Sequence, residues 1–352
     1  DMDALAAAKR RPYVKKEKRK RRIFVALLAV TILAVWGVIS FALYRLWAPV
    51  ARPSVTEGTT EAIPEITTVR TPTGTVVTEA PRTETITLTA DDVHRGDLIL
   101  VSTLLGRAYA FPKNESELVT LYGNKSGSYR VSSSAIKLTR TMMAALDDMF
   151  DAFFAETGSR DYQITQGYRT YDEQAAIYDD YQEIYGAEQG ALLAARPGYS
   201  EHHTGMAIDM NVYTASGVSY SLATAGAADP IYGWIYENAA KYGIVLRYPD
   251  SKTTVTGITN EPWHFRYVGR GHAAYMAENG LVLEEYLALL YTHGAESPLT
   301  FTADGVRYEV YYVPAADGET KIELPLGADY TVSGDNDGGF IVTLRTADMT
   351  IE

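Results

Sequence analysis

The sequence contains no cysteine among its 352 residues. Disulfide bonds are therefore excluded, and so are a thiolate nucleophile and a cysteine-ligated zinc site. The fold must be stabilised by its hydrophobic core, and a chain of this length with 46% hydrophobic residues can bury one of sufficient size.

Basic residues are scarce outside the N-terminal region. The net charge of the chain is −12, although residues 1–22 carry ten basic and only three acidic side chains. Everything after residue 22 is consequently strongly acidic. Because binding to phosphates requires a basic surface, an acidic body argues against nucleic acid as a partner.

Charged residues are absent from residues 23–44, between Arg22 and Arg45. As a helix this segment would span roughly 33 Å, about the thickness of a bilayer core. A cleaved signal peptide is the alternative, but the apolar run is too long and no convincing cleavage site follows it. We predict one transmembrane helix in the cell membrane, with residues 1–22 as a cytoplasmic tail and the remaining chain outside.

Apolar periodicity is missing from the next segment, in which threonine and proline dominate. This composition predicts a disordered stalk over residues 45–90. Residues 91–294 then mix strand and helix patterns, including a helix over residues 134–156 that ends at Gly158 and a helix opened by Thr170 with a capping box to Glu173. Residues 295–352 alternate with period two between Asp-Gly turns, which predicts a small, separable β accessory domain.

A short segment over residues 200–209, Ser-Glu-His-His-Thr-Gly-Met-Ala-Ile-Asp, contains candidate metal ligands. His202 and Asp209 are seven residues apart and cannot share one helical turn, but a loop carrying His202 can fold back on a strand carrying Asp209. Gly205 permits the tight return. A catalytic zinc ion takes three nitrogen or carboxylate ligands and leaves one position open, so one more ligand is required.

That ligand is predicted in residues 261–267, Glu-Pro-Trp-His-Phe-Arg-Tyr. His264 projects to one face of a strand, and Glu261 lies three residues before it at the strand entrance. From there Glu261 can approach a water molecule at the metal without ligating the metal, as a general base must. His203 is expected to support the structure rather than bind metal.

Together these segments resemble the VanY-type D-alanyl-D-alanine carboxypeptidases, zinc enzymes of the lysostaphin, D-Ala-D-Ala peptidase and hedgehog-like group. The resemblance is carried by Ser-x-His-x-x-Gly-x-Ala-x-Asp at 200–209, by Glu-Pro-Trp-His-x-Arg-Tyr-Val-Gly at 261–269, and by Gly-Tyr-Arg-Thr at 167–170 with Gln174 downstream. It covers roughly residues 91–292.

The resemblance implies an α+β fold with a central antiparallel sheet flanked by helices. It implies zinc held by His202, Asp209 and His264, and Glu261 as the base. It also implies that Arg169 faces the scissile carbonyl, a role that its place before a capped helix supports. Gln174 and Ser200 are implied to contact the substrate, which is the D-Ala-D-Ala end of the peptidoglycan stem peptide.

Other functions remain open from the sequence. An L,D-carboxypeptidase or a peptidoglycan endopeptidase would use the same chemistry. A zinc-bearing but inactive wall-binding module is a further alternative, against which the presence of Glu261 and Arg169 argues.

Overall fold

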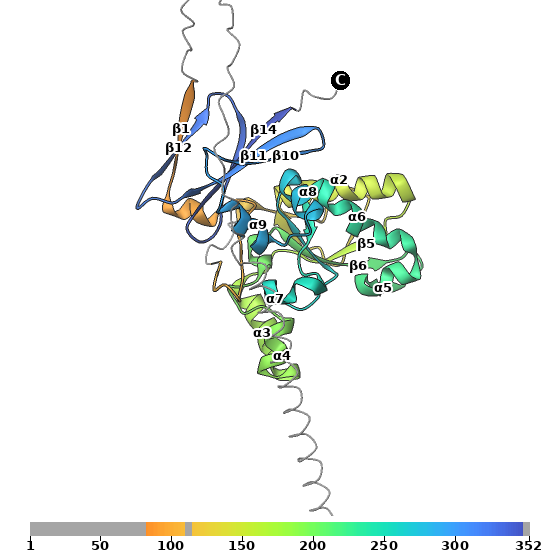
Figure 1. Cartoon of the computed structure of the whole chain (residues 1–352). Coiled ribbons are helices and arrows are strands. Elements are labelled where there is room, and N and C mark those ends of the chain that lie inside the picture. The colour runs from red at the N-terminus through yellow and green to blue at the C-terminus, as the bar shows by residue number, and fades with distance from the viewer. Residues whose placement is uncertain (1–81, 110–114, 348–352) are drawn as a thin grey trace, which may run out of the picture. The chain divides into compact units, whose positions relative to one another are not determined.

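The structure is a computed structural model that describes residues 82–109 and 115–347, which belong to one compact unit (Figure 1). Within these two ranges, no helix is both long enough and apolar enough to cross a membrane. The predicted cytoplasmic tail, the transmembrane segment 23–44 and most of the predicted stalk lie outside them.

A mixed sheet forms the centre of the molecule, with the strand order β3-β5-β6-β9-β8 and β7 paired to β6. Every pair is antiparallel except β3 with β5. The predicted α+β class with a largely antiparallel sheet is therefore confirmed. The strands are β3 (Arg130–Val131), β5 (Tyr162–Gln166), β6 (Ala207–Tyr213), β7 (Ser219–Ser221), β8 (Ile244–Leu246) and β9 (His264–Tyr267).

One face of this sheet is covered by the helix α2 (Arg140–Thr157). Its apolar stripe, which includes Met149 and Phe153, packs against inward-facing strand residues such as Ile208. The helix begins six residues later than predicted, because residues 137–139 form β4 (Lys137–Thr139), which pairs with β2 (Leu118–Thr120). Thr139 then caps the helix by accepting a hydrogen bond from the Met142 amide.

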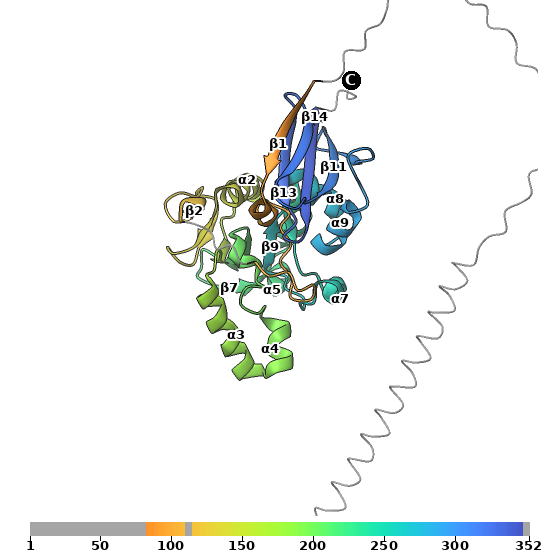
Figure 2. The ribbon, with the colours of Figure 1, turned by 90° about the vertical axis from the view of Figure 1, so that its left-hand side faces the viewer.

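Two helices form a hairpin that projects from the body on the side away from β1 and β14 (Figures 1 and 2). They are α3 (Tyr171–Tyr185), which starts at the predicted Thr170–Glu173 capping box, and α4 (Ala187–Leu193). Short helical segments lie in the loops that connect these elements. They are η2 (Glu115–Glu117), η3 (Glu201–Thr204), α5 (Leu222–Ala228), η4 (Pro230–Gly233), α6 (Trp234–Asn238), η5 (Ala239–Tyr242), η6 (Asp250–Lys252) and α7 (Thr253–Thr256).

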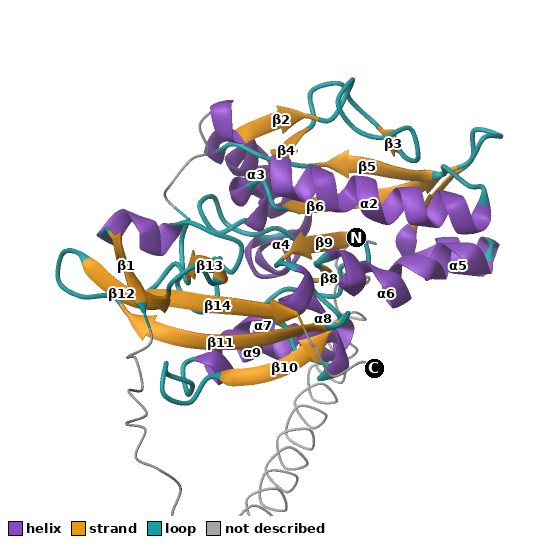
Figure 3. Cartoon of the chain, turned by 90° about the horizontal axis from the view of Figure 1, so that it is seen from above, coloured by secondary structure: helices purple, strands orange, loops and turns teal. Residues whose placement is uncertain are grey.

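The C-terminal region forms a four-stranded antiparallel sheet in the order β10-β11-β14-β13 (Figure 3). Helices α8 (Arg270–Glu278) and α9 (Leu283–Leu290) pack between this sheet and the central one, and a common core joins Val268, Leu287 and Ile341. The strands of this sheet are β10 (Leu299–Ala303), β11 (Val306–Pro314), β13 (Asp329–Gly334) and β14 (Gly339–Ala347), while β12 (Thr320–Pro325) lies outside it.

The predicted stalk was expected to end at residue 90, but its last part forms a strand of the folded unit. Residues 83–88, Thr-Glu-Thr-Ile-Thr-Leu, form β1 (Thr83–Leu88) and pair in antiparallel register with β12. The alternating sequence explains the strand, because Ile86 and Leu88 point to one face and join a small core around Phe340. The 3-10 helix η1 (Ala90–His94) follows directly and buries Val93 in the same core.

The C-terminal strands, predicted as a separable accessory domain, pack directly against the rest of the unit. Besides sharing a core with α8 and α9, they receive β1 from the opposite end of the domain. The Asn336 side chain also donates hydrogen bonds to the carbonyls of Leu100 and Ala108. The predicted boundary at residues 294 and 295 therefore cuts through continuous packing.

Candidate active site

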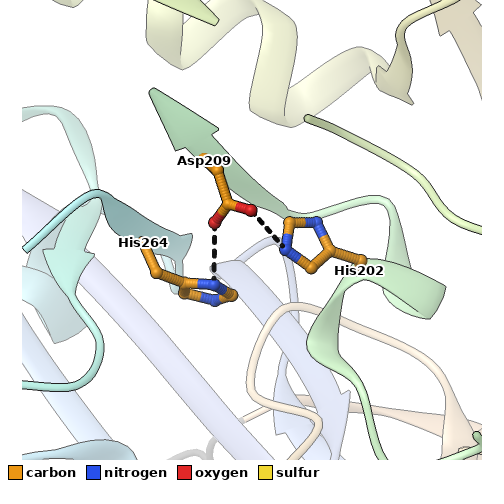
Figure 4. A group of neighbouring side chains, drawn as sticks. All are labelled: His202, Asp209 and His264. Carbon is orange, nitrogen blue, oxygen red and sulfur yellow. Dashed lines mark ion pairs between the residues drawn. The ribbon is translucent and has the colours of Figure 1, made fainter. Parts of the chain in front are cut away.

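The register of the central sheet brings two predicted ligands together. Asp209 on β6 and His264 on β9 are directly paired across the two strands. Their side chains consequently project from the same face, and Asp209 Oδ1 lies 3.2 Å from His264 Nδ1 (Figure 4).

His202 reaches the same point from the 3-10 helix η3. Ser200 caps this helix through its hydroxyl, and Gly205 ends it with a φ of 68°. A side chain at Gly205 would be strained by this φ and would meet Leu118 at 2.9 Å, so glycine is needed for the return into β6. The turn places His202 Nε2 3.4 Å from Asp209 Oδ2.

The three ligand atoms lie within 4.8 Å of one another and fit a metal ion. His202 Nδ1 is 2.8 Å from the Gly167 carbonyl oxygen, to which it donates, and this leaves Nε2 free to ligate. Asp209 Oδ1 is buried and has no hydrogen bond in the described part of the chain. Two imidazole nitrogens, one carboxylate and an accessible cleft are typical of a catalytic zinc site.

Burial and neighbouring charges shift the pKa values of all three side chains. Burial raises the pKa of Asp209, but the neighbouring His202 and His264 more than offset this and hold it well below its usual range. Burial lowers the pKa of His202. Burial also opposes the charge of His264, yet its interactions with Asp209 and Glu201 raise its pKa to about 9.

Glu261 lies beside the metal cluster, at the turn that leads into β9. The His264 amide donates to the Glu261 carbonyl, which brings the Glu261 carboxylate to 3.5 Å from His264 Nδ1. Burial raises the pKa of Glu261 to about 7. A carboxylate with such a pKa can both accept and return a proton near neutral pH.

Arg169 comes from the loop between β5 and α3 and is largely buried at the edge of the cluster. Its Nη2 lies 3.9 Å from Asp209 Oδ2, and its Nη1 donates to Gln174 Oε1 at 2.7 Å. The Gln174 amide in turn donates to the Ala195 carbonyl at 2.7 Å, so both ends of this buried side chain are engaged. Gln174 therefore holds Arg169 in place, although it also lines the cleft.

The cluster lines a cleft of about 120 Å³. Ile177 and Tyr181 of α3 line one side, and Tyr248, Ile258 and Trp263 also line the cleft. Tyr248 was not singled out from the sequence, although its ring centroid lies 4.8 Å from that of His264. Aromatic residues are too frequent in this chain for the sequence alone to distinguish it.

Glu201 was also not identified as a site residue from the sequence. Its side chain is fully buried and lies 3.4 Å from His264 Nε2 through Oε2. The only signal in the sequence is its place directly before His202, in a segment that is otherwise buried. Its role as a partner of His264 depends on a contact across 63 residues of chain.

The region that contains these motifs matches a known protein family. The VanY family, described as D-alanyl-D-alanine carboxypeptidase, matches residues 135–270. A D-alanyl-D-alanine carboxypeptidase of Enterococcus faecium is 33% identical over 262 residues, which cover 74% of this chain and 79% of the relative. The chain belongs to the VanY family.

Further relatives extend the similarity beyond the motif region. A D-alanyl-D-alanine carboxypeptidase of Enterococcus faecalis is 33% identical over 72% of this chain and 89% of its own length. The crystal structure of the D,D-dipeptidase VanXYg in complex with a D-Ala-D-Ala phosphinate analog superposes with a TM-score of 0.62, at 31% identity over 75% of this chain and 100% of that one.

Membership of the VanY family confirms the main functional predictions. The chain is a D-alanyl-D-alanine carboxypeptidase, and zinc is the cofactor of this family.

Proposed function

We propose that His202, Asp209 and His264 hold the catalytic zinc and that the cleft above them removes the terminal D-alanine of peptidoglycan stem peptides. The observation that carries this assignment is the convergence of the three ligand atoms within 4.8 Å, with the Glu261 carboxylate 3.5 Å from His264 Nδ1. Zinc bound by such a set supplies a Lewis acid that polarises a carbonyl and makes water more acidic.

Glu261 is the proton carrier in this reaction. Its carboxylate removes a proton from the water that attacks the penultimate carbonyl. As the peptide bond breaks, Glu261 returns that proton to the nitrogen of the departing D-alanine. Its raised pKa suits both steps, because neither protonation state is strongly favoured near neutral pH.

Arg169 stabilises the negative charge that develops on the carbonyl oxygen. Its guanidinium lines the cleft beside Asp209, and its Nε is buried without a hydrogen-bond partner in the described residues. Gln174 fixes the orientation of the guanidinium through its 2.7 Å contact. Ser200, which also lines the cleft, is the second proposed contact of the substrate.

The substrate assignment is supported by VanXYg, which is described in complex with a D-Ala-D-Ala phosphinate analog. The cleft has a volume of only about 120 Å³, which suits the end of a peptide better than its middle. The stem pentapeptide ending in D-Ala-D-Ala is therefore the proposed substrate, and the tetrapeptide and cross-linked dimer are the comparison substrates.

The test is Glu261→Gln, which keeps the size of the side chain but cannot accept a proton. We expect the variant to fold and retain zinc while releasing D-alanine from pentapeptide at least about 100-fold more slowly, the usual contribution of acid–base catalysis. Glu237→Gln, an exposed change on α6, is the matched control and should keep full activity. A near-normal rate in Glu261→Gln would assign the proton transfer to another group.

We also propose, from residues 1–44, that the enzyme is anchored in the cell membrane with its catalytic unit on the outer side. The uncharged run 23–44 and the basic segment before it support this topology. Protease added to intact protoplasts should then degrade the catalytic unit. Its survival while a known outer-surface marker is cleaved would contradict the orientation.

A further inference from the structure

Glu201 is the centre of a buried group of charged side chains next to the metal cluster. Its Oε1 accepts hydrogen bonds from Arg247 Nε at 2.8 Å and from Arg266 Nη1 at 2.9 Å. Its Oε2 lies 3.4 Å from His264 Nε2. The side chains of Glu201, Arg247 and Arg266 are inaccessible to solvent.

The two histidines of the cluster present different nitrogens to the proposed metal. His202 donates from Nδ1 to the Gly167 carbonyl, which leaves Nε2 near Asp209. His264 is turned the other way, because its Nε2 faces Glu201 while its Nδ1 lies 3.2 Å from Asp209 and 3.5 Å from Glu261. The ring orientation of His264 therefore depends on what holds its Nε2.

We propose that Glu201 is a positioning residue that keeps the Nε2 proton of His264 and thereby commits Nδ1 to the metal. This inference rests on the proposed assignment of His264 as a zinc ligand. A carboxylate behind a ligating histidine fixes the ring and makes the imidazole more basic, and the loss of such a partner usually weakens metal binding about 10- to 100-fold.

The two arginines balance the buried charge of the Glu201 carboxylate, because both donate hydrogen bonds to its Oε1. Arg247 is shared, since its Nη1 and Nη2 donate to both oxygens of Glu284 on α9. The remaining donors of Arg266 bind the backbone carbonyls of Asp97, Ile99 and Tyr267.

Glu284 provides a control for the structural part of this role. It is a buried carboxylate paired with the same arginine, but it binds the Nη1 and Nη2 atoms of Arg247, whereas Glu201 binds Nε. Glu201→Gln and Glu284→Gln therefore each remove one buried negative charge beside Arg247. Of the two, only Glu201→Gln alters the partner of His264 Nε2.

The first experiment uses the zinc-loaded full chain with ¹⁵N-labelled histidines and needs no change at Glu201. Long-range ¹H–¹⁵N spectra identify which ring nitrogen carries a proton, and His264→Ala assigns the signal. We expect His264 to carry a slowly exchanging proton on Nε2 and His202 to carry one on Nδ1. A His264 that is protonated on Nδ1 and bound to zinc through Nε2 overturns the proposal.

The second experiment measures zinc affinity by chelator competition in the full-length variants. We expect about 10- to 100-fold weaker binding in Glu201→Gln and nearly unchanged binding in Glu284→Gln. Unchanged affinity in Glu201→Gln, or equal losses in both variants, overturns the positioning role. If Glu201→Gln fails to fold, the spectrum of the unaltered chain decides the question.

These outcomes are distinguishable from a failure of the proposed function. Zinc retained at full affinity in His264→Ala would remove the ligand assignment itself. Zinc lost in His264→Ala, with Glu201→Gln unaffected, would overturn only the role of Glu201.

Discussion

Asp209 and His264 lie directly opposite each other in the antiparallel register of β6 and β9, with Asp209 Oδ1 3.2 Å from His264 Nδ1. Neighbouring positions along a strand point to opposite faces, so a shift of one residue would turn His264 away from Asp209. The metal site is thus built into the hydrogen-bonded sheet, and only His202 is supplied by a loop.

Removal of His264 should abolish metal binding. His264→Ala leaves one imidazole and one carboxylate, which are too few for a stable zinc site. We expect the purified variant to contain far less than one zinc per chain by elemental analysis. The control is His293→Ala, which should retain zinc, because His293 forms a hydrogen bond with the Ser297 carbonyl and is not a proposed ligand. Full zinc content in His264→Ala would contradict the ligand set.

Gln174→Ala should slow catalysis through Arg169. The change removes a 2.7 Å hydrogen bond to the guanidinium and leaves the Ala195 carbonyl without its donor. A hydrogen bond to a charged group contributes about 1.5–3 kcal/mol, so we expect a loss of roughly 10- to 100-fold in kcat/KM. Zinc content should stay normal. Gln189→Ala, an exposed change on α4, is the control. Equal activities of the two variants would exclude this role of Gln174.

Loss of β1 should destabilise the catalytic unit although the strand is remote in sequence from the site. A fragment starting at Ala90 lacks the pairing of β1 with β12 and exposes the core that Ile86 and Leu88 cover. Burial of two partly covered apolar side chains suggests a loss of about 2–4 kcal/mol in the free energy of unfolding. Urea denaturation compares this fragment with one starting at Arg82. Identical midpoints would show that β1 contributes nothing.

The stability of the chain should fall in mild acid because of His272. Burial, with a smaller contribution from Arg345, lowers its pKa from 6.5 to about 4, and its ring contacts Tyr286 and Thr343. Between these pH values His272 is protonated in the unfolded chain but stays neutral in the folded chain. Stability is therefore lost as the pH falls from about 6.5 to 4, by up to about 3 kcal/mol.

The measurement is the free energy of unfolding against pH in the presence of a chelator, which removes the contribution of metal binding. His272→Gln should flatten the curve in this window. Thr343→Val removes a hydrogen-bond partner without removing a titrating group, so it should lower stability while keeping the slope. An unchanged slope in His272→Gln would show that His272 does not cause the acid sensitivity.

Much of the site could be predicted from the sequence because the chemistry is local in two motifs. His202 and Asp209 are separated by a turn that contains Gly205, and Glu261 and His264 are joined by a turn at a strand entrance. The capping box of α3 was likewise predicted, since Thr170 and Glu173 lie within one turn. Such short-range patterns are set by backbone geometry and can be recognised without knowing the fold.

The contacts of Gln174 and Glu201 could not be predicted in the same way. Gln174 was expected to contact the substrate, but both ends of its amide are bound within the protein. Of the arginine partners of Glu201, Arg247 directly follows β8 and Arg266 lies on β9, and the sequence does not indicate which buried arginine meets which carboxylate. The stalk boundary failed for a related reason, because β1 is stabilised by β12, more than 230 residues away.

The sequence by itself determined the chemical class of this protein, because the residue types and spacings of the two motifs limit which metal and which reaction they can serve. The tertiary structure decided how those residues act on one another. The register of β6 and β9 sets Asp209 against His264, and burial raises the pKa of Glu261. Such effects depend on distance and on exclusion of water, which arise only when segments far apart in the chain pack together.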